Sequence, residues 1–383
     1  MTTKPYQITV LGATGWTATI CAEHIAKTFP ADAKWCIAGR SAVKLQALRQ
    51  SLRAIDQDRL EPTIYVIPQL DAQGLDPVIK ETSVLINGIG PYHKYGAPVV
   101  ESCARNGTHY VDFSTETMWI SEMIRDYHVV AQASGAIIIP AISGSSAPSD
   151  LMAWLVVRQI RDQGLPAPHE VVCSGKLNML GMQGVKVGHG LFGHRYDRHL
   201  GHLAMSFVAW GNESVVHRSA AFDQKTYGQH FVFREYIPST GFISAVMAYI
   251  LTKLGIVLVA VPWFRSFIRT KSFDRGTGPD RTESRKAESA EWKAAGYVKG
   301  TKDPVAIARF HYDGALVDMA AILAVEAAGA INDILRTETS GYLQAGIVTP
   351  STLGTPFVSR LQVVGFEVEV HGDNGHLQKP VMM

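Results

Sequence analysis

Short apolar runs alternate with helical patterns along the first 150 residues of the chain. The apolar runs predict strands, and apolar positions spaced three and four residues apart predict helices. The predicted strands are Gln7–Leu11, Trp35–Ala38, Thr63–Ile67, Val84–Asn87, His109–Asp112 and Ala136–Ile139. The predicted helices include Trp16–Thr28, Ala42–Leu52 and Ala97–Asn106. This alternation predicts an α/β fold with a doubly wound parallel sheet, whose ligands bind at the carboxyl ends of the strands.

The pattern changes after Asp150. A helix is predicted over Leu151–Gln163, and His169–Leu177 begins a pattern typical of an antiparallel sheet in an α+β domain. Apolar and polar positions alternate again near the end, which predicts a strand over Val363–Val370. We therefore divide the chain into an α/β domain (1–150), an α+β domain (151–345) and a C-terminal segment (346–383) that packs back near the first domain.

One segment of the second domain, residues 242–268, is unusually apolar. Phe242–Pro262 has about the length of a transmembrane span. Lys253 and Gly255 interrupt its centre, and a central lysine costs about 2.5 to 3.5 kcal/mol on insertion scales. We therefore favour a helical hairpin over a spanning helix. This hairpin could pack on the rest of the fold, on a second subunit of a homodimer, or peripherally on a membrane surface.

The most informative motif lies where the first predicted strand meets the first predicted helix. Gly12, Gly15 and Ala18 follow the spacing Gly-x-x-Gly-x-x-Ala. The first glycine permits a tight turn, the second lets the backbone approach phosphates, and the small third residue lets the helix pack close to the strand. N–H groups at the start of that helix then face an anion. The motif predicts a dinucleotide site; the alternative is a tight turn without a ligand.

The end of the second predicted strand indicates which dinucleotide binds. NAD enzymes of this fold usually carry an acidic residue there, but this chain has Arg40 and, one turn later, Lys44. The guanidinium of Arg40 can clamp a 2′-phosphate, so NADP(H) is the predicted cofactor; a surface cap is its alternative role. The predicted cofactor-binding residues are Gly12, Thr14, Gly15, Trp16, Ala18, Arg40, Ser41, Lys44, Asn87, Gly88 and Gly90.

Composition and charge narrow the class of protein. The 383 residues are 46% hydrophobic and 18% charged, with a formal net charge of +2, as in a folded globular protein. No basic stripe or nucleic-acid motif is present, so no nucleic-acid partner is expected. Four widely spaced cysteines predict reduced, buried thiols, and no signal segment is recognised near the N-terminus. We expect a cytoplasmic protein, with attachment to a membrane or lipid surface as an addition.

Further motifs link the chain to a known family. They are Val10–Gly15, Ile37–Ser41, Asn87–Tyr92, Tyr95-Gly96, Val99-Val100, Gly107–Asp112, Pro148–Asp150, Phe233–Tyr236 and Gly346–Pro350. Together they resemble the saccharopine dehydrogenase-like oxidoreductases, including the trans-acting enoyl reductases. The resemblance implies a Rossmann-type domain, an inserted α+β domain and nicotinamide-dependent reduction. Members of that family act on amino-acid imines or on double bonds in lipid and polyketide products.

The chain departs from the family where the substrate cleft is expected. Thr115 replaces a glycine, and the stretch 143–146 lacks the aspartate that usually precedes Pro-Ser-Asp. A Gly/Thr/Ser-rich helix start is replaced by the histidine-rich stretch 188–196. The resemblance therefore implies that the cofactor motifs are kept while the substrate motifs have changed.

Hydride transfer also needs a group that stabilises or protonates the developing charge. The catalytic candidates are Tyr92, Glu116, Thr115 and Ser145, with Tyr92 and Glu116 as first choices. Ring packing and helix capping are the alternative roles of those two. The predicted substrate contacts are His93, Ser146, His189, His194 and Tyr196. The histidines from His189 to His202 are spaced five, five and three residues apart without a suitable partner, so no metal site is predicted.

The sequence thus predicts an NADP-dependent reductase of a C=C or C=N bond in a hydrophobic small molecule, of polyketide or lipid type, from specialised metabolism. Two alternatives stay open. One is a non-redox isomerase or cyclase on the same scaffold, with a vestigial or structural nucleotide. The other is a non-catalytic protein of lipid surfaces that uses 242–269 as its anchor.

Overall fold

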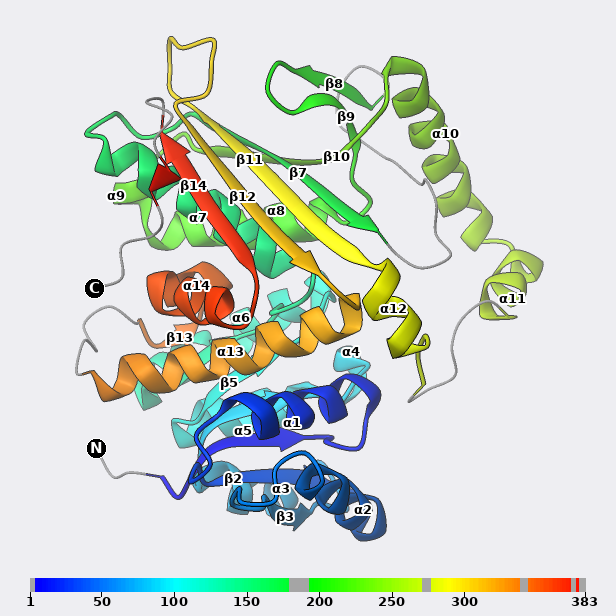
Figure 1. Cartoon of the computed structure of the whole chain (residues 1–383), viewed down its shortest axis with the longest axis vertical. Helices are drawn as coiled ribbons and strands as arrows, with labels where there is room; N and C mark the ends of the chain where they lie inside the picture. The colour runs from blue at the N-terminus through cyan, green and yellow to red at the C-terminus, as the bar shows by residue number, and fades with distance from the viewer. Residues whose placement is uncertain (1–3, 179–192, 271–276, 338–343, 373–376, 379–383) are drawn as a thin grey trace. The chain divides into compact units, whose positions relative to one another are not determined.

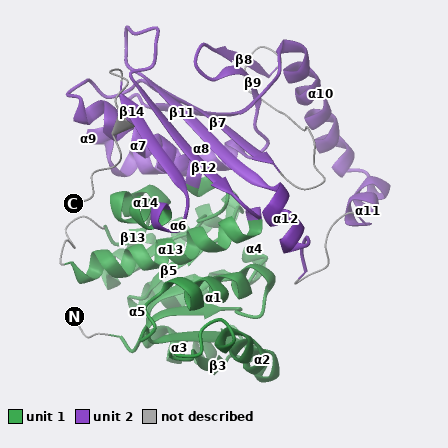
Figure 2. Ribbon diagram, viewed as in Figure 1, with its two compact units in different colours: residues 1–147, 317–361 green, residues 148–316, 362–383 purple. Residues whose placement is uncertain are grey.

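The chain forms two compact units. The computed structural model describes residues 4–178, 193–270, 277–337, 344–372 and 377–378 (Figure 1). Unit 1 comprises residues 1–147 and 317–361, and unit 2 comprises 148–316 and 362–383 (Figure 2).

A seven-stranded sheet forms the centre of unit 1, in the order β13-β6-β5-β4-β1-β2-β3. All of its pairings are parallel. The strands are β1 (Tyr6–Leu11), β2 (Trp35–Gly39), β3 (Thr63–Val66), β4 (Thr82–Asn87), β5 (His109–Asp112), β6 (Ile137–Ile139) and β13 (Gly346–Ile347). The inner strands are almost wholly buried, as in a sheet covered on both faces. The order reverses between β1 and β4, which is where doubly wound sheets bind their ligands.

Local sequence signals explain most helices of unit 1. Ser41 caps the N-terminus of α2 by accepting a hydrogen bond from the Lys44 N–H, and Asp71 caps α3 in the same way. Gly107 and Gly135 adopt left-handed conformations where α5 and α6 end. The helices are α1 (Trp16–Thr28), α2 (Ala42–Arg53), α3 (Ala72–Lys80), α4 (Tyr92–Tyr95), α5 (Ala97–Asn106), α6 (Thr117–Ser134), α13 (Leu316–Arg336), the 3₁₀ turn η1 (Pro350–Leu353) and α14 (Gly354–Val363).

Unit 2 contains an eight-stranded mixed sheet in the order β15-β14-β12-β11-β7-β10-β9-β8. Its neighbouring strands are antiparallel, apart from the parallel pair β7 and β10. The strands are β7 (Glu170–Asn178), β8 (His194–Asp197), β9 (Gly201–Met205), β10 (Val232–Pro238), β11 (Ser289–Tyr297), β12 (Ala306–Asp313), β14 (Glu367–Gly372) and β15 (Leu377–Gln378). Together with unit 1, this arrangement confirms the predicted α/β fold with a second α+β domain.

The helices of unit 2 differ sharply in burial. They are α7 (Ser146–Asp162), which crosses the boundary between the units, α8 (Ala209–Phe222), α9 (Gln224–Tyr227), α10 (Phe242–Val259), α11 (Pro262–Thr270) and α12 (Arg281–Ala287). By length and composition, α10 could cross a membrane: its mean hydropathy is 2.2, and only 11% of it is buried. The predicted apolar segment is therefore two successive helices that are largely exposed.

Two expectations from the sequence differ from the structure. The strand predicted over Val363–Val370 is wrong at its start, because α14 continues to Val363 and Gly365, at a φ of 97°, precedes β14. The unit boundaries also differ from the three predicted parts. Helix α13 clusters with unit 1 although it lies within the predicted 151–345 domain, and residues 362–372 cluster with unit 2. Helical periodicity in α13 identifies a buried helix but not the sheet on which it packs.

Candidate functional site

The turn after β1 is shaped by Gly12. Its φ is 72°, a left-handed conformation that favours glycine, and its N–H donates to the Ala38 carbonyl on β2 (2.8 Å). A Cβ at this position would lie 2.7 Å from the Ile89 side chain. Gly15 then precedes α1 as its N-cap, with no side chain to bond the first N–H groups of the helix. These groups are therefore available to an anion.

A second glycine turn follows β4, the neighbour of β1 in the sheet. The Gly88 N–H donates to the Leu11 carbonyl (2.9 Å), which ties the two turns together. A Cβ on Gly88 would lie 2.5 Å from the Cβ of Ala18 on α1. Gly12, Gly88 and Ala18 thus allow three backbone segments to approach one another at the point where the strand order reverses.

Two cations stand at the carboxyl end of β2. Arg40 directly follows the last residue of β2, and Lys44 lies in the first turn of α2; both side chains are exposed. Within the described parts of the chain, neither makes an ion pair. This is the position at which a 2′-phosphate is recognised in dinucleotide-binding folds of this type. The arrangement fits NADP(H): glycines leave room for the pyrophosphate, and two unpaired cations lie at the neighbouring strand end.

The other predicted cofactor residues have mixed surroundings. Thr14 and Gly90 are exposed, whereas Trp16 and Ser41 are partly buried. Asn87 is fully buried, and its Oδ1 accepts a hydrogen bond from the Ile89 N–H (3.0 Å). Asn87 therefore holds the glycine turn from the protein interior and does not face solvent.

Asn87 belongs to a buried polar network that the sequence analysis did not single out. Its Nδ2 donates to the Tyr110 hydroxyl (3.1 Å), which in turn donates to Asp112 Oδ2 (2.6 Å). Burial raises the pKa of Asp112, although hydrogen bonds from Tyr110 and Ser114 oppose the shift. These hydrogen bonds connect the turn after β4 to the end of β5.

Asp112 also holds the loops that follow β5 and β6. Its Oδ1 accepts hydrogen bonds from the N–H and hydroxyl of Ser114 (2.9 and 2.7 Å) and from the Ala141 N–H (3.0 Å). Ala141 has a φ of 62°, which is uncommon for a residue with a side chain. One carboxyl group thus organises the ends of three neighbouring strands. The motif containing Gly107–Asp112 was the only sequence signal for it.

Tyr92 has the surroundings of a structural residue. The residue is buried, its hydroxyl donates to the Asn87 carbonyl (3.0 Å), and its ring packs against Trp119 at a centroid distance of 5.4 Å. Burial and the nearby Asp112 carboxylate raise the pKa of Tyr92 well above its ordinary value. A hydroxyl with these constraints is a poor proton donor to a bound molecule, so the geometry favours the packing role.

Glu116 and His93 form a pair at the start of α4. Glu116 accepts hydrogen bonds from the N–H groups of Tyr92 (2.7 Å) and His93 (2.9 Å) and from His93 Nδ1 (2.5 Å). Burial opposes ionisation, but these hydrogen bonds prevail and lower the pKa of Glu116. The carboxylate is therefore ionised at neutral pH, which suits an anchor for α4 better than a general acid.

The remaining candidates of unit 1 lie on loops or at a helix start, at the carboxyl edge of the sheet. Thr115 is exposed in the loop after β5. Ser145 lies in the loop that leads into α7 and Ser146 is the first residue of that helix; the Ser146 N–H donates to Ser143 Oγ (3.1 Å). Ser145 is partly exposed and Ser146 is buried. Of these three residues, Thr115 is the most accessible.

The predicted substrate contacts of the second domain gather on β8, in unit 2. His194 Nε2 lies 2.9 Å from Nδ1 of His202, and its ring meets that of Phe242 edge-on at 5.1 Å. Tyr196 is exposed and packs edge-on against His202. Burial and the neighbouring His202 lower the pKa of His194. His189 lies outside the described residues, and the described residues contain no group of three or more potential metal ligands.

Unit 2 also contains a buried carboxyl group that the sequence analysis left without a role. Glu235, only 2% exposed, accepts hydrogen bonds from Ser149 Oγ (2.8 Å) and Asn212 Nδ2 (2.9 Å). Desolvation raises its pKa to about 7, against the opposing effect of these hydrogen bonds. Glu235 and Ser149 come from two of the family motifs, Phe233–Tyr236 and Pro148–Asp150, so the motifs meet in the folded unit.

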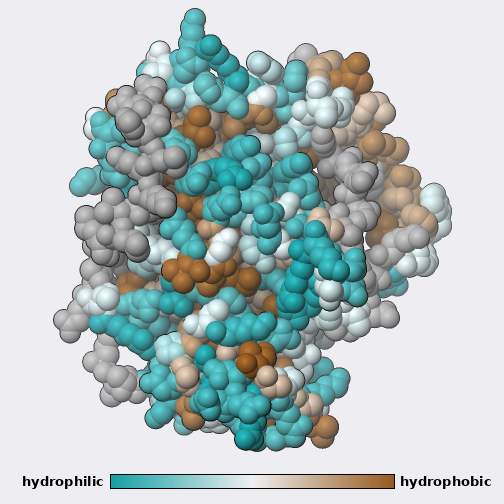
Figure 3. Space-filling model, viewed as in Figure 1, coloured by the Kyte–Doolittle hydropathy of each residue, from teal (hydrophilic) through white to brown (hydrophobic). Residues whose placement is uncertain are grey.

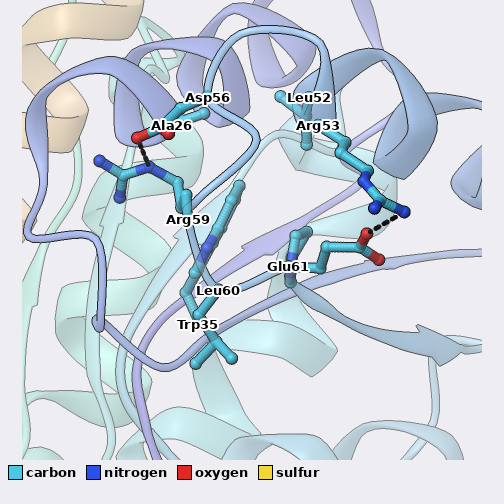
Figure 4. Close-up of a pocket in the computed structure, with 9 residues that line it drawn as sticks. Ala26, Trp35, Leu52, Arg53, Asp56, Arg59, Leu60 and Glu61 are labelled. Carbon is cyan, nitrogen blue, oxygen red and sulfur yellow. Dashed lines mark ion pairs between the residues drawn. The ribbon is translucent and has the colours of Figure 1, made fainter.

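The structure has a small hollow away from these residues (Figure 4). Its volume is only about 10 Å³, and it lies beside Trp35, the first residue of β2, whereas Arg40 follows the last. Two ion pairs border it, Arg53 with Glu61 (3.4 Å) and Arg59 with Asp56 (3.5 Å). The hollow is therefore at the opposite end of β2 from the proposed nucleotide-binding turns.

The parallel sheet, the two glycine turns and the cations after β2 define the class of a dinucleotide-binding domain. Residues 8–139 match the family described as "Saccharopine dehydrogenase NADP binding domain". This match confirms the resemblance to saccharopine dehydrogenase-like oxidoreductases and the prediction of NADP(H).

Several curated proteins are similar over part of the chain. A trans-acting enoyl reductase of Mycobacterium leprae is 34% identical over 157 residues, 41% of this chain and 37% of that protein. A saccharopine dehydrogenase-like oxidoreductase of Rattus norvegicus is 33% identical over 39% of this chain and 36% of that protein. A lipid droplet localized protein of Caenorhabditis elegans is 31% identical over 38% of this chain and 35% of that protein. The match thus spans little more than a third of these relatives. Their names agree with the predicted oxidoreductase class.

One solved structure resembles both units of the chain. The apo form of saccharopine dehydrogenase (L-Glu forming) from Saccharomyces cerevisiae aligns over 95% of this chain and 99% of its own, with a TM-score of 0.54. The sequence identity is 13%, so the similarity concerns the fold.

Proposed function

We propose that the protein is an NADP-dependent reductase of a C=C or C=N bond in a hydrophobic small molecule. The observation that carries this proposal is the meeting of the β1 and β4 turns, where Gly12 and Gly88 leave room for a pyrophosphate. Arg40 and Lys44 supply positive charge at the neighbouring strand end. The names of the enoyl reductase and oxidoreductase relatives support the reaction class.

The chain's own residues would bind and orient the nucleotide. The first N–H groups of α1 would bind the pyrophosphate, and Arg40 with Lys44 would hold the 2′-phosphate. Bound NADPH would supply a hydride to the substrate. The network of Asn87, Tyr110 and Asp112 would keep the turn after β4 in the geometry that accepts the cofactor.

The proton for such a reduction has to come from a group other than Tyr92 or Glu116, since the hydroxyl of Tyr92 bonds a carbonyl and Glu116 is an ionised anchor. Solvent can supply this proton, and the exposed hydroxyl of Thr115, next to Glu116 in the chain, could relay it. A hydroxyl or water could also stabilise an oxyanion by hydrogen bonding.

The test uses NADPH deuterated at the transferred position and a panel of hydrophobic enoyl esters, enones and cyclic imines. We expect oxidation of NADPH with at least one class and deuterium on a carbon of its product. Product formation without NADPH oxidation would instead establish the isomerase or cyclase alternative. Failure to bind NADPH would overturn the reductase.

A lipid surface is the proposed location of this activity. The exposed apolar helix α10 supports it, and a relative is named for lipid droplets. A reductase at such a surface would meet substrates that are too apolar to accumulate in water. Flotation of the protein with phospholipid vesicles tests this location independently of catalysis.

A further inference from the structure

The helices α10 and α11 form an exposed apolar surface on unit 2, which we call the arm (residues 242–270). Large apolar side chains on both helices face solvent: Ile243 is 78% exposed, Val257 66% and Trp263 66%. Other exposed members are Phe242, Met247, Ile250, Leu251, Leu254, Ile256, Val259, Phe267 and Ile268. Figure 3 shows apolar atoms along the edge where α10 lies in Figure 1. A surface this apolar is unusual on a soluble monomer and indicates an interaction site.

Only the first part of α10 packs on the rest of unit 2. Ala245 and Ala248 are its buried residues, and the helix contacts β9. From Leu251 to Val259, apolar side chains occur on every side of the helix, and α11 has no buried residue. The arm is thus attached at its beginning and projects its apolar part into solvent.

Charge distinguishes a lipid surface from a second copy of the chain. Residues 242–270 contain three cations, Lys253, Arg265 and Arg269, and no Asp or Glu. A symmetric contact between two arms would bring equal charges together without acidic partners. Anionic phospholipid headgroups complement this charge, and the amphipathic end with Trp263, Phe267 and two arginines is typical of helices at membrane interfaces.

The topology of unit 2 determines how the arm can meet the lipid. Helix α10 is about 27 Å long at about 1.5 Å per residue, close to the ~30 Å hydrocarbon core of a bilayer. However, β10 precedes the arm and β11 follows it, and both strands lie in the same sheet with only β7 between them. If α10 crossed the bilayer, the chain would have to cross back before reaching β11.

No segment can make that return. Helix α11 has nine residues and is about 14 Å long, too short to span the core. The ten residues 271–280 include Lys271, Asp274, Arg275 and Asp280, and charges so closely spaced make it very costly for a segment to cross a hydrocarbon core. We therefore propose that the arm enters one leaflet of a phospholipid surface and leaves by the same side. This proposal rests on the proposed lipid contact and specifies its geometry.

Such an anchor suits both a bilayer and the phospholipid monolayer that covers an oil droplet, because it needs only one leaflet. A spanning helix could not be accommodated by the monolayer. The distinction can be measured with thiols, because the chain has four cysteines and all are buried. A cysteine introduced on the arm would be the accessible thiol.

The experiment uses T240C, T270C and I250C proteins with sealed vesicles of phosphatidylcholine and phosphatidylserine. Thr240 precedes α10, Thr270 ends α11, and all three positions are exposed. We expect the proteins to float with the vesicles. A membrane-impermeant maleimide added outside should label T240C and T270C, while I250C should be labelled only without vesicles. Binding to monolayer-coated triacylglycerol droplets should follow.

Other results would overturn the proposal in distinguishable ways. Labelling of T270C only by reagent trapped inside the vesicles would show a spanning helix and leave the lipid contact intact. Absence of flotation would refute the lipid contact itself, and a stable dimer that is disrupted by L251E/L254E would identify a second copy as the occupant. In the proposed account, L251E/L254E lowers flotation at least tenfold, whereas V43E/V363E, at exposed valines outside the arm, does not.

Discussion

Gly88 and Ala18 approach so closely that a methyl group on Gly88 would lie 2.5 Å from the Cβ of Ala18. Gly88 directly follows β4 and Ala18 lies in the first turn of α1, so this contact fixes how near the helix comes to the turn after β4. Since the two turns form the proposed pyrophosphate site, the contact links packing to cofactor binding.

The substitution Gly88→Ala should weaken NADPH binding at least tenfold and destabilise the fold by about 1 to 3 kcal/mol, as overpacking does. Gly255→Ala on α10 is the control, since a Cβ there meets no atom within 4 Å and the position belongs to unit 2 rather than to the two glycine turns. Ala18→Gly added to Gly88→Ala should restore part of the affinity, because it removes the methyl group that clashes. Affinity is measured by fluorescence titration and stability by urea unfolding. Equal affinities for the two alanine variants would contradict the close-packing argument.

The substitution Tyr110→Phe should destabilise unit 1 by about 1 to 3 kcal/mol, because it leaves buried groups of Asn87 and Asp112 without a partner. Tyr65→Phe is the control. Tyr65 lies on the partly exposed edge strand β3, and its hydroxyl donates to Glu81 (2.6 Å), so a smaller loss of stability is expected. Chemical denaturation compares the two variants. A larger loss for Tyr65→Phe would mean that the network does not support the site.

Glu116→Gln tests the assignment of Glu116 as an ionised anchor. Its pKa is lowered in the folded state, so the unfolded state binds more protons and the carboxylate stabilises the fold above its unfolded pKa. The wild type should therefore be more stable than Glu116→Gln at pH 7, and this difference should shrink as the pH falls through about 4.5 and below. Thermal unfolding at a series of pH values measures it. A difference that persists unchanged at pH 3 would argue against an ionised Glu116.

Glu235→Gln should reveal the opposite dependence. The folded-state pKa is raised to about 7, so the folded state binds more protons and the stability that Glu235 contributes is lost as the pH rises. Between pH 5 and 8 the wild type should lose up to about 3 kcal/mol relative to Glu235→Gln, from about 1.4 kcal/mol per pKa unit. Urea unfolding of both proteins at each pH gives this difference. A constant difference would show that Glu235 does not titrate in this range.

The sequence was sufficient for features that depend on neighbours in the chain. Helix α1 begins and ends at the predicted residues, Trp16 and Thr28, because a glycine turn and an apolar periodicity define it locally. The glycines, Arg40 and Lys44 were proposed as cofactor-binding residues from equally local patterns, and that assignment stays a prediction. The parallel sheet followed from the alternation of strands and helices.

Contacts between residues that are far apart in the chain could not be predicted from local sequence patterns. Glu116 caps α4 across 24 positions of the chain, and Glu235 meets Ser149 across 86. Tyr92 was a first choice for catalysis because the pattern shows a tyrosine at a strand end but not the carbonyl that its hydroxyl bonds. Likewise, the apolar pattern of 242–262 did not reveal that α10 remains exposed.

The central claim is that Arg40 recognises the 2′-phosphate of NADPH, and fluorescence titration of the Arg40→Glu protein with NADPH and NADH tests it most directly. Arg53→Glu, at an exposed arginine that ends helix α2, is the control for charge. The account predicts NADPH binding weakened ten- to a hundredfold in Arg40→Glu, with NADH binding nearly unchanged and both affinities preserved in Arg53→Glu. Equal losses for the two nucleotides, or no saturable NADPH binding by the wild type, would contradict it.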